Sequence, residues 1–389
     1  MLPAAASRQS RASDTAQRIG ADVASQFADE VDRDARFPAE AIHALRAERM
    51  LSMFVPVELG GDGCTISDLS AVCTALGQHC SATGMVFAMH QIQVACIVRH
   101  AADSAFFTDY LTNLVEKQSL IASATSEIGV SGDVRSSVCA AEVRDGVFYV
   151  TKQAPVISYA EHADAILVTA RRTPSSPPSD QVLVLLDTGD FTLSRTSAWN
   201  TLGFRGTCSP GFTLDGSGPA AQILSEPFAS ISCETMLPVS HIVWASLWLG
   251  MATAAVSRAR AYLRAEARRN PGKTPAASVR LADVVSRLQT MRAVVNDAVR
   301  QYERTMHDSG ELSGMSFAIR MNNLKLVCST AVMEIVSQCM LICGMAGYGN
   351  ESKFSLGRLL RDAYGAALMI NNDRIYGANA SMLLVSKDD

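Results

Sequence analysis

The order of helix-prone and strand-prone segments is the feature that most constrains the fold of this chain of 389 residues. Residues 12–119, and the chain from about residue 234 onward, place apolar residues at helical spacing. Between these blocks, residues 120–225 contain short runs rich in β-branched residues, separated by Gly, Pro and Asp. A small β block between two helical blocks does not fit a doubly wound α/β fold, in which strands and helices alternate. The sequence therefore predicts a mainly helical α+β protein.

One polar loop in the β block is a candidate ligand site. It reads Ser-Glu-Ile-Gly-Val-Ser-Gly-Asp over residues 126–133. Its hydroxyls and backbone N–H groups lie beside glycines, and Gly lacks the Cβ that would keep the backbone away from a planar polar ligand. An ordinary connection between strands has a similar composition, so the ligand interpretation depends on the rest of the chain.

Composition and charge narrow the class of protein. The chain is 48% hydrophobic and 19% charged, as in a folded soluble protein, and its net charge of −4 argues against a general nucleic-acid binder. The ten cysteines are scattered without Cys-x-x-Cys spacing, which indicates a reducing compartment and no metal site. We see no secretory signal, and the most apolar run, residues 237–256, contains Pro, Ser and His. We expect a soluble, cytoplasmic protein without a membrane span.

Two features bear on phosphate binding. The glycines of residues 344–349 follow a helix-prone segment rather than a strand, which argues against a Rossmann fingerprint. Arginines are frequent between residues 258 and 304. Most of them should lie on solvated helical faces, and a minority could meet the phosphates of a cofactor, of CoA or of a carrier-protein arm.

Several motifs, taken in order, resemble those of the acyl-CoA dehydrogenase superfamily of flavoproteins. They are Val-Pro-Val-Glu-Leu-Gly-Gly-Asp-Gly at 55–63, the loop at 126–133, Leu-Gly-Phe-Arg-Gly-Thr at 202–207, the glycines at 344–349 and Arg-Leu-Leu-Arg-Asp at 358–362. The resemblance covers nearly the whole chain. It implies an N-terminal helical domain (1–119), a central β-barrel-like domain that cradles a flavin (120–227) and a C-terminal four-helix bundle (228–389).

The resemblance also implies which residues meet the flavin ring. Ser126 matches the family's hydroxyl contact to the ring, and Ser158 matches the hydroxyl near its reactive nitrogen. Gly129 and Gly132 would shape the loop between them. Val156 stands where an aromatic residue commonly stacks on the ring.

The contacts to the rest of the cofactor are altered. Arg268 falls in the motif that reads Arg-x-x-Phe-Gly in the family, but here the motif ends in Pro-Gly. Gly344 begins the family's glycine motif, in which Leu341 replaces a Gln. FAD is the expected cofactor, with FMN as the alternative. Since the family completes its cofactor site across subunits, we expect a homodimer or a homotetramer.

The catalytic Glu of the family is missing. The dehydrogenases use this Glu to remove a proton α to a thioester carbonyl while hydride goes to the flavin. Its position corresponds to Ile370 here, and the alternative position early in the first C-terminal helix corresponds to Ser240. Neither residue can accept the proton.

Three residues are candidates for a relocated base. His241 follows the alternative Glu position, and a neutral imidazole there could accept the proton. A purely structural role for His241, packed beside Trp244 in the apolar run, is the competing interpretation. Asp373 is the next candidate, and His90 is expected to be a buried structural histidine.

The implied reaction is oxidation of an acyl thioester, on CoA or a carrier protein, to its α,β-unsaturated product. A flavin-dependent monooxygenase of the same fold is the alternative, because it needs no base for an α proton. A flavin-free scaffold is a third interpretation, and the presence of both Ser126 and Ser158 argues against it.

Overall fold

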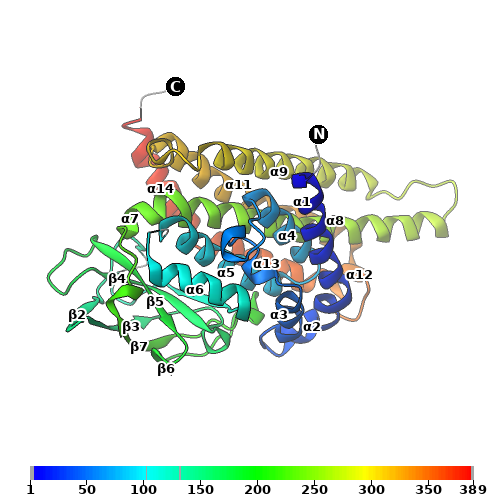
Figure 1. Cartoon of the computed structure of the whole chain (residues 1–389). Helices are drawn as coiled ribbons and strands as arrows, with labels where there is room; N and C mark the ends of the chain where they lie inside the picture. Colours follow the sequence, from blue (N-terminus) through cyan, green and yellow to red (C-terminus); the bar gives the residue numbers. More distant parts are fainter. Residues whose placement is uncertain (1–3, 102, 131–132, 387–389) are drawn as a thin grey trace.

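The N-terminal block is helical. The computed structural model describes residues 4–101, 103–130 and 133–386. The helices of this block are α1 (Ala4–Ile19), α2 (Ser25–Arg33), α3 (Ala39–Ala47), α4 (Ile66–Gly77), α5 (Ser81–His100) and α6 (Ala105–Lys117), drawn in blue to cyan in Figure 1. A capping box begins α4: the Thr65 hydroxyl accepts the N–H of Asp68, whose carboxylate accepts the N–H of Thr65.

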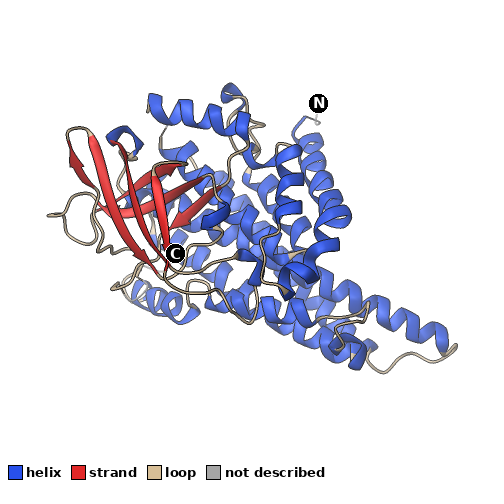
Figure 2. Ribbon diagram, turned by 90° about the horizontal axis from the view of Figure 1, so that it is seen from below, coloured by secondary structure: helices blue, strands red, loops and turns tan. Residues whose placement is uncertain are grey.

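The central block forms two sheets. Its strands are β1 (Ile121–Ala124), β2 (Glu142–Arg144), β3 (Val147–Ala154), β4 (Ala165–Arg171), β5 (Gln181–Asp187), β6 (Phe191–Arg195) and β7 (Phe212–Pro219). One sheet has the order β1-β4-β5, with β1 parallel to β4; the other is antiparallel with the order β2-β3-β7-β6. Figure 2 shows the strands gathered at one end of the molecule, beside the helices.

The C-terminal block is helical again. It contains α7 (Phe228–Ile231), α8 (Leu237–Arg269), α9 (Ser278–Thr305), α10 (Ser309–Leu312), α11 (Met315–Cys343), α12 (Met345–Tyr348), α13 (Gly357–Leu368) and α14 (Asn372–Leu383). The far ends of α8 and α9 protrude as a hairpin on the side opposite the sheets (Figure 1). The boundaries expected at 119/120 and 227/228 fall in the connections between the last helix and first strand, and between the last strand and α7.

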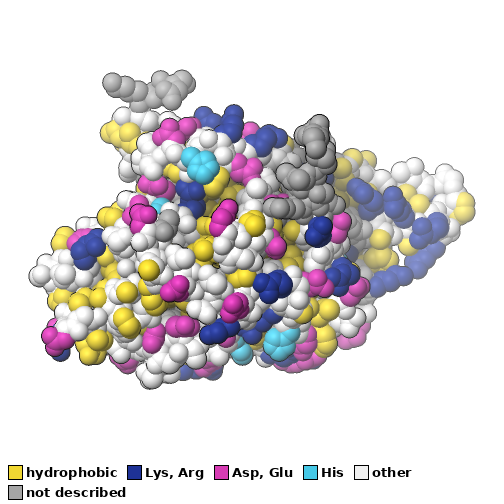
Figure 3. Space-filling view, in the orientation of Figure 1, with side chains coloured by type: hydrophobic (Ala, Val, Ile, Leu, Met, Phe, Trp, Pro, Cys, Tyr) yellow, Lys and Arg dark blue, Asp and Glu magenta, His cyan; other side chains and the backbone are white. Residues whose placement is uncertain are grey.

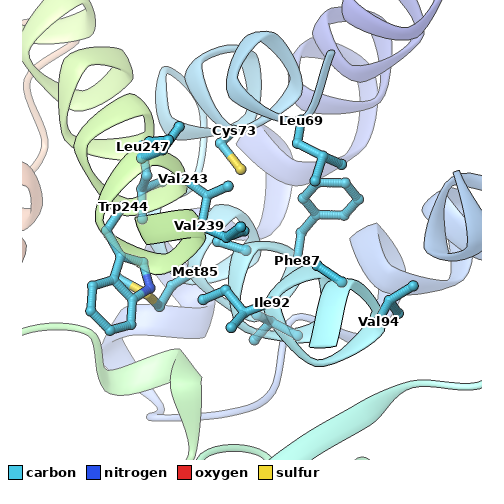
Figure 4. Close-up of a cluster of buried hydrophobic side chains, with 14 of the residues drawn as sticks. Leu69, Cys73, Met85, Phe87, Ile92, Val94, Val239, Val243, Trp244 and Leu247 are labelled. Atoms are coloured by element: carbon cyan, nitrogen blue, oxygen red, sulfur yellow. The ribbon is translucent and has the colours of Figure 1, made fainter. Parts of the chain in front are cut away.

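Close packing of α4, α5 and α8 builds the centre of the core. Figure 4 shows side chains of these three helices meeting there, among them Cys73, Phe87 and Val243. Two glycines permit the close approach: a Cβ on Gly77 would lie 2.4 Å from the carbonyl oxygen of Leu247, and one on Gly84 would lie 2.5 Å from its Cδ1. Replacing either glycine would therefore push α8 away from its neighbours.

Long apolar helices form the inside of this protein. Three helical stretches are long and apolar enough to cross a membrane: Ser81–His100, Phe228–Arg269 and Met315–Cys343. In the first two, 89% and 94% of the apolar window is buried within the fold, and in the third 50% is buried. The apolar run at 237–256 is thus a core helix, as the sequence predicted.

Candidate functional site

A buried ion pair anchors the loop that follows β1. The Nζ of Lys152 lies 3.1 Å from Oε2 of Glu127, and both side chains are at most 3% exposed. Glu127 also accepts hydrogen bonds from the Ser137 hydroxyl at 2.6 Å and from the Cys139 N–H at 2.5 Å. Burial acts to raise the pKa of Glu127, but Lys152 and these donors hold the pKa below its usual value. The loop is therefore fixed from beneath, directly beside Ser126.

The outer surface of the loop is apolar and open. The N–H of Ile128 donates to the carbonyl of Gln153 at 2.9 Å, which joins the loop to the end of β3. Gly129 has a φ of +98°, a value that favours glycine, and a Cβ there would meet only Val138, at 3.5 Å. The Ile128 and Val156 side chains are 55% and 38% exposed. Gly132 lies outside the described residues.

Ser158 belongs to a chain of hydroxyls just beyond β3. Its oxygen accepts a hydrogen bond from Ser209 at 2.9 Å, and Ser209 lies 2.8 Å from the Thr207 hydroxyl. The backbone N–H groups of Ile157 and Tyr159 donate to the carbonyls of Pro210 and Thr207. Because Ser158 accepts from Ser209, its own hydrogen remains available for a ligand.

These residues fit an isoalloxazine ring. The ring needs hydrogen-bond donors at its polar edge and apolar surface against its faces. Ser126 and Ser158 are half-buried hydroxyls, and the exposed side chains of Ile128 and Val156 accompany them. The glycine at 129 leaves room for close approach. Ser126 and Gly129 lie on either side of Ile128, which is bonded to the end of β3, and Ser158 follows β3 by four residues.

Arg268 and Gly344 belong to the C-terminal helical block, Arg268 in the last turn of α8 and Gly344 between α11 and α12. The helical rise of 1.5 Å per residue puts Arg268 about 40 Å along α8 from His241, toward the protruding hairpin. A pocket of about 410 Å³ lies there, lined by Arg258, Arg268, Lys353 and Phe354 among others. Figure 3 shows Lys and Arg side chains gathered along this hairpin. Because this hairpin lies on the side of the molecule opposite the sheets, one subunit does not bring its basic pocket to its own ring site.

His241 is a buried neutral imidazole with one free nitrogen. The side chain is 1% exposed, and its Nδ1 lies 3.0 Å from the carbonyl oxygen of Met321. A carbonyl only accepts, so Nδ1 carries the proton and Nε2 carries a lone pair, for which the described chain provides no partner. Burial lowers the pKa of His241 to about 4. The ring of Trp244 lies 6.3 Å away between centroids.

The other two candidate bases have different surroundings. His90 donates from Nε2 to the Leu51 carbonyl at 2.7 Å and accepts the N–H of Ile121 at Nδ1, so both nitrogens are occupied. The expectation of a structural histidine is confirmed. Asp373 has an exposed side chain in the first turn of α14, and its N–H donates to the Asn371 side chain at 2.9 Å.

No carboxylate occupies either position at which the family carries its Glu. Ser240 donates to the Leu237 carbonyl of its own helix at 2.8 Å. Ile370 has a φ of 43°, and its carbonyl accepts a hydrogen bond from Lys325 at 3.0 Å. Lys325 was not among the residues predicted from the sequence. The available signal was a lysine in a long apolar helix, four residues from Met321 on the same helical face.

Comparison with known proteins gives the family and two kinds of relative. The models of the acyl-CoA dehydrogenase N-terminal and C-terminal domains match residues 7–118 and 232–369. The chain is 24% identical to amino sugar nitrososynthase DnmZ of Streptomyces peucetius, over 87% of this chain and 84% of that protein. It is also 24% identical to cyclohex-1-ene-1-carbonyl-CoA dehydrogenase of Syntrophus aciditrophicus, over 86% and 79%.

A solved structure shares the fold throughout. FMN-bound TdsC from Paenibacillus sp. A11-2 superposes with a TM-score of 0.85, 18% identity and coverage of 97% of this chain and 98% of that chain. TdsC is a dibenzothiophene monooxygenase. At this identity the likeness establishes the fold and leaves the chemistry to the residues of this chain.

Proposed function

The chain belongs to the acyl-CoA dehydrogenase family and is a flavoprotein oxidoreductase, and from this premise we propose that it oxidises an acyl thioester, on CoA or a carrier protein, to the α,β-unsaturated product. The observation that supports the proposal is a pair of half-buried hydroxyls, Ser126 on the loop fixed by the Glu127–Lys152 pair and Ser158 just beyond β3. The relative from Syntrophus aciditrophicus is a dehydrogenase of a CoA thioester.

The protein's own residues would bind and orient the flavin ring and supply an acceptor for the α proton. A bound flavin supplies the acceptor for the two electrons that leave the acyl chain. Ser126 and Ser158 would donate hydrogen bonds to its ring, and the glycine at 129 would let the loop backbone lie against it. The proton on the α carbon then needs an acceptor supplied by the protein.

We propose His241 as that acceptor. Its Nδ1–H is bound to the Met321 carbonyl, which leaves the Nε2 lone pair available in the tautomer that a base requires. With its pKa lowered to about 4, the imidazole is neutral at pH 7 but a weak base. The substrate must therefore arrive with an α proton already acidified by hydrogen bonds to its thioester oxygen.

A second candidate function, flavin-dependent monooxygenation, is favoured by a specific observation. Neither Ser240 nor Ile370 provides a carboxylate, and a lysine ammonium contacts the carbonyl of Ile370 instead. A reaction that uses reduced flavin and oxygen needs no base for an α proton. A nitrososynthase and a dibenzothiophene monooxygenase are among the proteins to which this chain is similar.

Anaerobic mixing separates the two functions. The purified protein is loaded with FAD or FMN and mixed without oxygen with a panel of acyl-CoA and acyl-carrier-protein thioesters. Bleaching of the flavin absorbance by a thioester supports dehydrogenation. No bleaching, together with oxygen consumption only after external reduction of the flavin, supports monooxygenation. No flavin binding after loading with either form contradicts both functions and favours a scaffold.

We further propose FAD as the cofactor and an assembly of two or four copies. The basic pocket of Arg258, Arg268 and Lys353 suits phosphates, but it lies far from the ring site of its own subunit. A second copy could bring its hairpin to that site. Exposed apolar side chains on and beside α11, such as Leu341 and Met345, offer surface for such a contact. Light scattering of the yellow protein tests the assembly, and mass spectrometry of the released flavin tests its identity.

A cytoplasmic location is also proposed. The nine cysteines other than Cys64 are free thiols, as expected in a reducing compartment.

A further inference from the structure

Lys325 is fully buried, and no carboxylate of the residues that the structure describes forms an ion pair with it. It lies on α11, and its ammonium donates to the carbonyl oxygen of Ile370 at 3.0 Å and to the side-chain oxygen of Asn372 at 2.5 Å. Both acceptors are neutral. Within the described chain, burial alone accounts for the shift of its pKa to about 8, and no acidic group contributes. Burial of an unpaired charge is costly, so a lysine in this environment needs a specific reason to be there.

The residue that Lys325 holds has an unusual backbone. Ile370 has a φ of 43°, in the left-handed region that β-branched residues rarely adopt. Such a conformation persists only where the surroundings enforce it. The side chain of Ile370 is 42% exposed, so little packing of its own holds it in place. The hydrogen bond from Lys325 to its carbonyl is a restraint that acts directly on this peptide.

A second contact ties the same turn to α11. The side-chain amide of Asn372 donates to the Ser329 hydroxyl at 3.1 Å, one helical turn beyond Lys325. Asn371, between the two restrained residues, caps α14 through its side chain. The turn of residues 369–372 is thus attached to α11 at Lys325 and Ser329.

The same face of α11 sets the orientation of His241. Met321, whose carbonyl accepts from Nδ1 of His241, precedes Lys325 by one helical turn. The Ile370 turn and the free Nε2 of His241 are therefore both positioned from one short stretch of α11.

We propose that Lys325 is a positioning residue for the reaction: it holds the left-handed turn at Ile370 and so fixes the loop that borders the reacting substrate. That this loop lies beside the substrate rests on the proposed function. The attachment of the turn to α11 through the lysine follows from the contacts alone.

The test compares Lys325→Met with a matched control, Asn379→Leu. Asn379 joins α14 to α11 through hydrogen bonds with Asn322 and Asn323 at 2.7 and 2.9 Å, away from the turn. Hydrogen exchange is measured for peptides covering residues 369–373, and flavin reduction is measured at saturating thioester. In Lys325→Met we expect exchange in this segment to be at least tenfold faster. The reduction rate should fall about 100-fold, the usual effect of a misplaced reacting group, with flavin content unchanged.

Asn379→Leu should lower the melting temperature without either change. Lys325→Arg should retain slow exchange. If Lys325→Met exchanges and reduces within twofold of the unmodified protein, the proposal is wrong. If the unmodified protein is bleached by no thioester, the proposed dehydrogenation has failed, and the exchange measurement alone decides the role of Lys325.

Glycine rescue covers the case in which Lys325→Met folds poorly. Gly adopts a positive φ without strain, so adding Ile370→Gly removes the need for an external restraint on the turn. We expect the double variant to regain soluble expression and at least part of the reduction rate. Equal behaviour of the single and double variants would contradict a role for Lys325 in holding this turn.

Discussion

Two lysines of the described residues, Lys152 and Lys325, are fully buried, and they differ in what surrounds the charge. Lys152, in the β domain, faces the carboxylate of Glu127, while Lys325, in the helical bundle, faces only a backbone carbonyl and a side-chain amide. The first arrangement balances a charge with its opposite and fixes a loop permanently. The second leaves the charge uncompensated and lowers the pKa of Lys325 to about 8. The charge on Lys152 therefore has a structural role in the β domain, whereas the contribution of Lys325 in the helical bundle depends on whether its amine is protonated.

The largest effect is expected from breaking the balanced pair. Lys152→Met leaves Glu127 buried without its counter-charge, which should lower the free energy of unfolding by about 3–5 kcal/mol. The loop at Ser126 should lose its shape, so flavin content should fall as well. Denaturant unfolding and flavin absorbance measure the two effects. Adding Glu127→Gln removes the stranded charge and should recover most of the stability; no recovery would show that the pair is not the source of the loss.

The next effect is expected at His241 on α8, which is bonded to the carbonyl of Met321 on α11, the helix that carries Lys325. If Nε2 of His241 accepts the α proton, His241→Ala should slow anaerobic flavin reduction by roughly 10²–10⁴-fold with flavin content unchanged. Stopped-flow absorbance measures this rate. Thr253→Val, which removes a hydrogen bond within α8 only, serves as the control. Reduction at the unmodified rate would make His241 structural, and Asp373→Asn would then be the variant to test.

The free energy of unfolding should also depend on pH at both sites, in the alkaline range at Lys325 and in the acid range at the Glu127–Lys152 pair. In the unfolded chain Lys325 keeps its proton up to about pH 10.4, but in the folded chain only up to about pH 8. Between these values the unfolded state binds more protons, so the free energy of unfolding rises with pH. From pH 8 to 10, this rise should reach on the order of 2 kcal/mol relative to Lys325→Met.

Glu127 acts at the acid end. Its pKa is lowered in the folded state, so its contribution is present above the pKa of an ordinary Glu and is lost as pH falls through the folded value. Urea unfolding of the unmodified protein, Lys325→Met and Glu127→Gln at matched pH values measures both windows. A flat difference between pH 8 and 10 would mean that the folded state binds the Lys325 proton as firmly as the unfolded state does, so that the pKa of Lys325 is not lowered.

The smallest effect concerns a site without any charge. Ser158→Ala removes one hydroxyl donor from the ring site, and one neutral hydrogen bond contributes about 0.5–1.5 kcal/mol. Binding of FAD or FMN should weaken by roughly 2–10-fold, as measured by fluorescence titration. Thr151→Val, on the exposed face of β3, the strand that precedes Ser158, is the control. A loss of affinity as large as that of Lys152→Met would mean that the hydroxyl chain from Thr207 to Ser158 supports the loop itself.

The fold was accessible from the sequence because its signals are local. Helical spacing, short β-branched runs and their order along the chain gave the mainly helical α+β fold. The Ser126 loop was identified by its own hydroxyls and glycines, and Ser158 by its position in the resemblance to the family. His90 was predicted to be structural, and its two hydrogen bonds confirm this.

The contacts of the buried charged residues could not be predicted from the sequence in the same way. Glu127 and Lys152 meet only because β3 returns beneath the loop, and their positions in sequence do not show this pairing. Lys325 binds a carbonyl 45 residues further along the chain, and any residue could supply that carbonyl. The tautomer of His241 likewise depends on a backbone oxygen of α11. Contacts to backbone atoms carry no sequence signature, so such roles become visible only in three dimensions.

The distance between the ring site and the basic hairpin has a consequence for how the protein keeps its cofactor. Where one copy supplies the hydroxyls at Ser126 and Ser158 and another supplies Arg268, retention of the flavin follows mass action among subunits as well as between protein and ligand. Dilution of the protein would then release flavin even at a constant concentration of free flavin. The cell could therefore set the active fraction of this protein by its rate of synthesis alone, with activity rising more steeply than abundance.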